Sequence, residues 1–99
     1  MSADRLRRGS HYELLRSASA PLEVRFEADW KERTRTGRIR RRLLFSASRR
    51  ALSRNGRKTR PKLIVGQTYA IQRTRETLNV RLVASTRVHT GRYLVLRPV

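Results

Sequence analysis

Residues 22–30 read Leu-Glu-Val-Arg-Phe-Glu-Ala-Asp-Trp, and their alternation is the clearest structural signal in the chain. Every second residue is apolar, and every residue between them is charged. A period of two is typical of a β-strand that buries one face and exposes the other to water. The stretch therefore predicts a strand whose inner face carries Leu22, Val24, Phe26, Ala28 and Trp30.

The residues that follow predict a second strand paired with the first. Thr36-Gly37 is a favourable turn, and a chain that reverses there pairs residue 35 with residue 38. In that register Trp30 lies opposite Leu43, and apolar side chains of both strands share the inner face. We therefore predict a strand over residues 38–46 that forms a hairpin with the first strand.

One arginine-rich helix over residues 38–54 is the alternative for this region. Apolar residues recur there at every fourth position, and Asn55-Gly56 would end a helix. We favour the strand because the hairpin register agrees with the apolar pattern, and we predict only a short helical turn over residues 48–54. Residues 55–61 then form an exposed basic loop.

Shorter apolar runs fill the rest of the chain and are separated by turn residues. About six short strands, with turns every eight to twelve residues or so, predict a mainly β fold, a small antiparallel barrel or sandwich. A turn at Arg75-Glu76 pairs residue 74 with residue 77 and places Ile71 opposite Val80. The further strands are predicted over residues 63–65, 68–73, 78–84 and 93–96, with a polar loop over 86–90.

The N-terminal part completes the predicted architecture. Ser10 and Glu13 have the spacing of a helix capping box, and Pro21 would close the segment, so one short helix is predicted there. Residues 1–9 are polar and basic, and we expect them to form a flexible basic arm. Residues 10–99 are predicted to form a single small β-rich domain.

Residues 63–71 read Leu-Ile-Val-Gly-Gln-Thr-Tyr-Ala-Ile, and this segment resembles parts of known small β proteins. Followed by two further strands, it is similar to the second half of SH3-like or OB-like barrels. Its Gly-x-x-Tyr-x-Ile pattern before a Leu-rich strand is also similar to small phage head-completion proteins. Both resemblances cover about residues 62–84. The first implies an SH3-like or OB-like barrel, and the second implies a structural role in a virion.

Positive charge is concentrated in residues 33–75, which contain thirteen Arg, two Lys and no acidic residue, within a chain of formal net charge +18. Such a density of one sign repels itself unless a polyanion neutralises it. Arg presents a planar guanidinium that binds phosphate at two points and stacks on bases. We therefore predict a non-catalytic protein that binds the phosphate backbone of RNA or DNA through an Arg-rich surface.

The candidate phosphate-binding side chains lie in the predicted second strand, the helical turn and the basic loop. Those of the strand would share its outer face, because alternate residues of a strand point the same way. Contacts to phosphate position a protein without reading sequence. The predicted set is Arg35, Arg38, Arg40, Arg42, Arg49, Arg50, Arg54, Arg57, Lys58, Arg60 and Lys62.

Two other functions stay open at this point. The first is a structural role in a large assembly, in which the positive surface contacts an acidic protein or packaged nucleic acid. Examples are a phage head-completion or head–tail joining protein and a ribosome-like particle protein. The second is a small basic ribonuclease toxin, in which His, Tyr, Lys or Arg side chains stabilise charge at phosphorus. His11 and His89 are the only histidines, and nothing in the sequence brings them together.

Composition limits the remaining possibilities. The chain has no Cys, no zinc-ligand spacing and no phosphate-binding Gly loop, so no cofactor and no metal is predicted. No apolar run approaches the ~20 residues of a membrane span, and we expect a cytoplasmic location or one within a nucleoprotein or virion particle.

The aromatic residues argue against a base-stacking platform. Five of the six, Phe26, Trp30, Phe45, Tyr69 and Tyr93, are in phase with an inner face and are predicted to lie in the core. Tyr12 is the best candidate for an exposed ring. We therefore expect recognition of backbone or shape, without stacking on bases.

Overall fold

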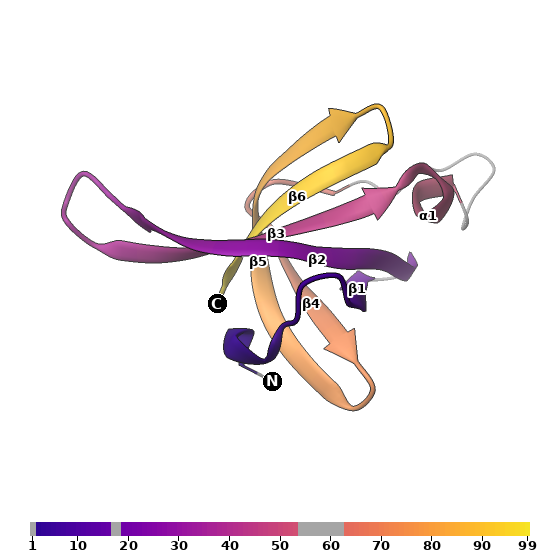
Figure 1. The fold of residues 1–99 in the computed structure, drawn as a ribbon, viewed down its shortest axis with the longest axis horizontal. Helices are drawn as coiled ribbons and strands as arrows, with labels where there is room; N and C mark the ends of the chain where they lie inside the picture. The colour runs from indigo at the N-terminus through magenta and orange to yellow at the C-terminus, as the bar shows by residue number, and fades with distance from the viewer. Residues whose placement is uncertain (1, 17–18, 54–62) are drawn as a thin grey trace.

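The computed structural model describes residues 2–16, 19–53 and 63–99, and it contains one antiparallel sheet of six strands (Figure 1). The strands pair in the order β1-β2-β3-β6-β5-β4, and β4 pairs with β1, so the ring of pairings closes. The predicted mainly β class with six antiparallel strands is confirmed. The elements are η1 (Ala3–Arg5), β1 (His11–Arg16), β2 (Ser19–Arg33), β3 (Ile39–Ser48), α1 (Arg49–Ser53), β4 (Thr68–Arg73), β5 (Glu76–Val88) and β6 (Gly91–Pro98).

The short N-terminal helix predicted from the capping-box spacing is wrong, because this segment forms β1. Tyr12 and Leu14 are buried while His11 and Glu13 are exposed, so the burial has the period of a strand. β1 is hydrogen-bonded to β2 on one edge and to β4 on the other. An isolated helix of two turns has marginal stability in water. Strand pairing on both edges stabilises this segment more than such a helix would.

The segment predicted as a flexible arm contains η1 and contributes two side chains to the core. Ala3 and Leu6 belong to the buried cluster. The Gly9 backbone N–H donates a hydrogen bond of 2.8 Å to the Phe26 carbonyl oxygen. The hydrogen bond joins the end of the segment to β2, while Asp4 contacts Arg41 of β3 and Arg5 contacts Glu76 of β5.

The predicted strand over residues 22–30 is confirmed and is longer at both ends in β2. The predicted register with β3 is wrong by one residue from Ala28 to Arg33, and by two at Phe26, beyond an irregularity in the pairing. Trp30 lies opposite Arg42, whereas Leu43 was expected there. The turn is one residue longer than predicted, because Gly37 adopts a left-handed conformation with φ of 82° and Arg33 pairs with Ile39. A change of one residue brings side chains of the opposite face into register.

The strand prediction for residues 38–46 and the helical turn after it are confirmed by β3 and α1, and the long-helix alternative is wrong. The predicted basic loop over 55–61 lies outside the described residues. The predicted strand over 63–65 is wrong, since Ile64 and Val65 are exposed and Val65 belongs to a turn. The predicted polar loop over 86–90 is shorter, because β5 continues to Val88.

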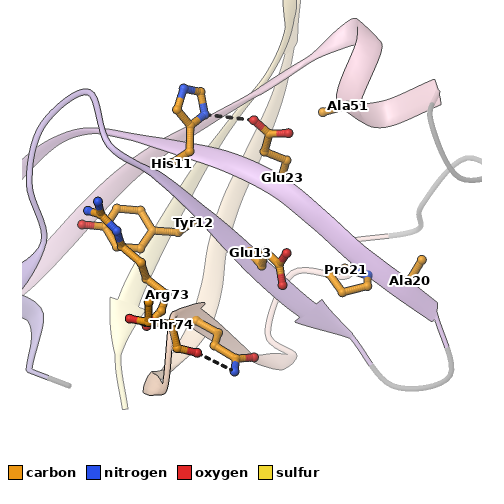
Figure 2. Close-up of a pocket in the computed structure, with 10 residues that line it drawn as sticks. His11, Tyr12, Glu13, Ala20, Pro21, Glu23, Ala51, Arg73 and Thr74 are labelled. Atoms are coloured by element: carbon orange, nitrogen blue, oxygen red, sulfur yellow. Dashed lines mark hydrogen bonds and ion pairs between the residues drawn. The ribbon is translucent and has the colours of Figure 1, made fainter.

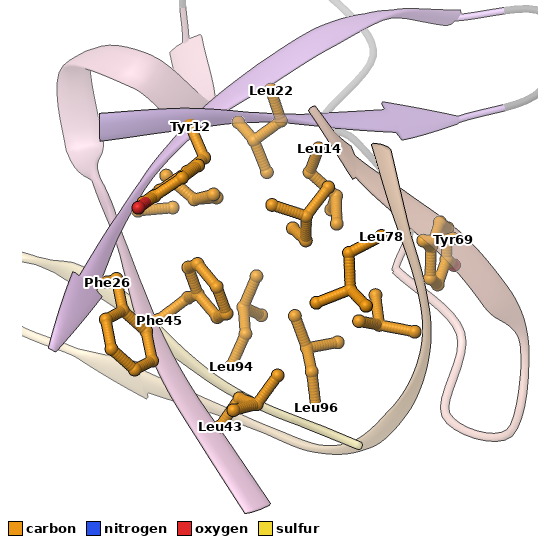
Figure 3. Packing of buried hydrophobic residues seen from close by; sticks show 14 of the residues in the cluster. Tyr12, Leu14, Leu22, Phe26, Leu43, Phe45, Tyr69, Leu78, Leu94 and Leu96 are labelled. Carbon is orange, nitrogen blue, oxygen red and sulfur yellow. The ribbon is translucent and has the colours of Figure 1, made fainter. Parts of the chain in front are cut away.

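The core fills the inside of the closed sheet, and leucine and aromatic side chains dominate it (Figure 3). Phe45 is fully buried, with its ring 5.2 Å from that of Phe26 and 6.1 Å from that of Tyr12 between centroids. The prediction of an exposed Tyr12 is therefore wrong. Trp30 and Tyr93, predicted to be core, are 36% and 37% exposed. Leu94 and Leu96 occupy the inner face of β6 in place of Tyr93.

Candidate nucleic-acid interface

The end of the β2–β3 hairpin projects from the rest of the sheet (Figure 1, left). We name residues 30–42 the basic ribbon. Trp30 to Arg33 of β2 pair with Ile39 to Arg42 of β3, and residues 34–38 connect them. Residues 30–40 are exposed except for Thr34, which is half-buried. Residues 30–40 of the ribbon therefore lie beyond the hydrophobic core and present both faces to solvent, while Arg41 and Arg42 are more buried and form its base.

The ribbon concentrates positive charge in a small volume. Seven of its side chains are basic and only Glu32 is acidic, which gives a local net charge of 7 − 1 = +6. Like charges on neighbouring strands repel each other, so bound anions would stabilise this arrangement. The basic side chains are Lys31, Arg33, Arg35, Arg38, Arg40, Arg41 and Arg42.

The turn of the ribbon is held by its own hydrogen bonds. The Thr34 N–H donates to the Arg38 carbonyl oxygen at 2.8 Å, and the Gly37 N–H donates to the Thr34 carbonyl oxygen at 2.9 Å. The Thr34 hydroxyl accepts from the Arg38 N–H at 3.2 Å. An isolated two-stranded hairpin is marginal in water, and these bonds help to keep Arg35 and Arg38 at the tip in one geometry.

Two clusters of side chains hold the base of the ribbon. On one face Arg41 donates hydrogen bonds to Asp4 and to Asp29, the second at 2.9 Å. The hydrogen-bonded Asp4 carboxylate raises the pKa of the Arg41 guanidinium above its ordinary value, burial opposes this, and Asp29 adds to the rise. Arg41 is therefore committed to contacts within the protein.

On the other face Glu32 connects Trp30 with Arg42. The Trp30 indole N–H donates to Glu32 at 3.0 Å, and the Arg42 Nε lies 3.4 Å from the other carboxylate oxygen. The Arg42 side chain is only 9% exposed. Arg42 was predicted to contact phosphate, but these positions make it a buried part of the ribbon base.

Five cations of the ribbon remain available to a partner. Within the part of the chain that the structure describes, none of them lies within ion-pair distance of a carboxylate. The ribbon therefore carries five exposed charges without an ion-pair partner in the described ranges. Its base differs, because Arg41 and Arg42 there are neutralised by carboxylates. The five available cations are Lys31, Arg33, Arg35, Arg38 and Arg40.

The structure divides the predicted set of binding residues. Arg35, Arg38 and Arg40 lie on the ribbon, while the exposed Arg49 and Arg50 lie on α1 at the opposite end of β3. Ten residues of β3 separate the two groups by about 30 Å. The other predicted residues, Arg54, Arg57, Lys58, Arg60 and Lys62, lie outside the described residues.

The predicted set omitted Lys31 and Arg33, which belong to the ribbon. One signal in the sequence points to them. Residues 31–41 contain only one apolar residue, Ile39, so a hairpin continued through this stretch has nothing to place against a core. A two-stranded segment without an inner face must project into solvent.

A separate pocket of about 590 Å³ lies beside β1 (Figure 2). His11 Nδ1 is 3.1 Å from Glu23, and Glu13 lies directly opposite Glu23 on the paired strand. The Arg73 guanidinium lies 5.6 Å from the centre of the Tyr12 ring. The pocket is therefore lined by charges of both signs, with one carboxylate, that of Glu23, in contact with His11.

Comparison of the chain with protein-family models, curated proteins and solved structures finds no match. Among residues 2–16, 19–53 and 63–99, no group of three His, Asp or Glu side chains is arranged to hold a metal ion. In the same ranges neither helical element has the length and apolar character needed to cross a membrane.

The Asp29 contact provides a test of how the base of the ribbon is neutralised. Replacing Asp29 with Asn should release part of the Arg41 charge and raise nucleic-acid affinity about two- to fivefold at ~0.15 M salt. The free energy of unfolding should fall by less than ~1 kcal/mol, as for other partly exposed ion pairs. Fluorescence anisotropy and urea denaturation measure the two effects.

The matched control for this variant is Glu27→Gln, which removes the same charge from β2. Glu27 pairs with Arg25, away from the ribbon. An equal rise in affinity for both variants would show that only net charge matters, and it would contradict the inference that Asp29 neutralises Arg41 at the base of the ribbon.

Proposed function

We propose that the protein binds nucleic acid non-catalytically through the phosphate backbone and that the basic ribbon is its principal contact. The observation that carries this proposal is the group of five exposed cations on a segment with no core beneath it. Phosphates placed along the ribbon would neutralise Lys31, Arg33 and Arg40, and release of counterions from the nucleic acid would supply much of the affinity.

The proposal includes a finer description of the fold. A small barrel of the SH3-like or OB-like kind is supported by the β1–β4 pairing, which closes the ring of strands. OB-folds bind oligonucleotides on the face of their second and third strands and on adjacent loops. The basic ribbon is formed by the corresponding pair in chain order, although likeness of fold alone does not establish function.

The salt dependence of binding tests the proposed function. Protein stripped of nucleic acid at high salt is titrated against a labelled 30-nucleotide DNA or RNA from about 0.05 to 0.4 M KCl. One phosphate contact for each of the five available cations of the ribbon predicts a slope of roughly −3.5 to −4.5 in log affinity against log salt. Affinity that stays constant over this range, or no binding at low salt, would contradict the proposal.

A structural role in a larger assembly is the second candidate, and the outer face of the sheet favours it. Leu44 and Val95 are paired across β3 and β6, with Ala28 and Ala84 paired to them on either side. All four are only half-buried, and Tyr93 is exposed nearby. Light scattering on nucleic-acid-free protein tests this role, since a defined oligomer supports it and a monomer contradicts it.

A further inference from the structure

We propose that the basic ribbon binds in the major groove of B-form duplex DNA, with Ile39 placed against the edges of the bases. The inference rests on the proposed function and specifies the form of nucleic acid. It is carried by three features of the described residues: the shape of the ribbon, the distribution of its cations and the exposure of Ile39.

The shape of the ribbon fits a groove that is both wide and accessible. The major groove of B-form DNA is about 12 Å wide and 8.5 Å deep, and it admits a two-stranded β-ribbon. The four pairs from Trp30–Arg42 to Arg33–Ile39 span about 10 Å along the strands, and the turn extends beyond them. The projection is therefore long enough to reach the floor of the groove.

Duplex RNA offers no equivalent surface. The A-form major groove is too narrow for side chains to read, and the minor groove is wide and shallow. A projecting ribbon would contact such a minor groove only with its tip. Arg33 and Arg40, which lie back from the tip, would then be left without phosphate partners.

The cations lie on both strands of the ribbon. Lys31 and Arg33 extend from β2, Arg40 extends from β3, and Arg35 and Arg38 lie at the turn. The major groove has a phosphate chain along each wall, so the cations on both strands of the ribbon would contact phosphates. A single strand has one phosphate chain and would leave one edge uncompensated.

Ile39 is the apolar exception on this basic surface. Its residue is 64% exposed, it pairs with Arg33, and Arg38 and Arg40 flank it. Burial of this side chain in the groove would remove apolar surface from water, and the C5 methyl group of thymine is an apolar partner there. Ile39 thus favours contact with base edges in addition to phosphates.

The first experiment compares forms of nucleic acid of one sequence. A 24-base-pair DNA duplex, the same duplex as RNA and its single DNA strand are titrated by anisotropy at ~0.15 M KCl. We expect the DNA duplex to bind at least tenfold more tightly than the other two. Equal or tighter binding of either would overturn the groove assignment but leave the proposed function intact, whereas binding to none would overturn both.

The second experiment tests the contact of Ile39. Replacing thymine by uracil in an A·T-rich DNA duplex removes the C5 methyl groups and should weaken binding of the wild type about three- to fourfold. Ile39→Ser should lose this difference, while Ile64→Ser, which alters another exposed Ile outside the ribbon, should keep it. No thymine dependence in the wild type, or its retention in Ile39→Ser, would overturn the contact.

Discussion

Replacing Arg33, Arg35, Arg38 and Arg40 together with Gln should lower the affinity for nucleic acid roughly 10²–10³-fold at ~0.15 M salt. Each lost phosphate contact removes about 0.9 from the log–log salt slope, so four losses reduce its magnitude by about 3.6. These side chains are exposed and form no ion pair with any residue in the described ranges. The thermal midpoint should therefore change little. Anisotropy at several salt concentrations and circular dichroism provide the two measurements.

A second quadruple variant distinguishes the effect of the ribbon on affinity from the effect of net charge. Replacing Arg7, Arg8, Arg75 and Arg87 with Gln also lowers the formal charge from +18 to 18 − 4 = +14. These four residues are also exposed but lie outside the ribbon. Affinity should fall less than tenfold, through the weaker long-range field alone. Equal losses in the two variants would mean that binding is delocalised over the surface.

Gly91→Ala should be the most destabilising single substitution among the described glycines, with a cost of roughly 3–5 kcal/mol. Gly91 begins β6 with φ of 149°, and a Cβ there would lie 1.9 Å from the Ala47 carbonyl oxygen. That oxygen belongs to the backbone of β3, so it cannot move without disturbing the sheet. Urea denaturation followed by circular dichroism measures the loss.

Gly37→Ala is the matched control for this substitution. Gly37 also has a positive φ, but no atom lies within 4 Å of the position of the added Cβ. Only the cost of the left-handed conformation remains, about 1–2 kcal/mol. A loss at Gly91 no larger than that at Gly37 would show that β3 and β6 can separate at little cost.

The two hairpins show which parts of the fold a local pattern predicts. The β2–β3 register differs from the predicted one by one residue, so Trp30 meets Arg42 and its indole joins the ribbon base. The β4–β5 register differs by two, since Ile71 lies opposite Leu78 where Val80 was expected. Because a shift of two preserves the face, Leu78 and Val80 remain inside as predicted.

The candidate site shows a similar division. The sign and density of its charge are properties of composition, so the acid-free stretch over 33–75 predicts a polyanionic partner directly. The length and direction of β3 decide which cations lie close enough to bind the same partner. Arg40 lies at one end of this strand, and Arg49 follows its opposite end. Arg42 is withdrawn from the surface by contacts with Glu32 on another strand.

The positions of most strands and the total charge were thus readable from the residues in order, because alternation and charge are local or additive quantities. β1 is an exception, because its segment has the spacing of a helix capping box and was predicted as a helix. Strand register, the burial of Tyr12 and Arg42 and the projection of the ribbon were not readable in this way. They depend on turn conformation at Gly37 and on pairing between strands distant in the chain, such as β1 with β4. The free energy of pairing two strands depends on the residues of both strands. A pattern within one stretch of sequence therefore cannot show which strands pair or in which register.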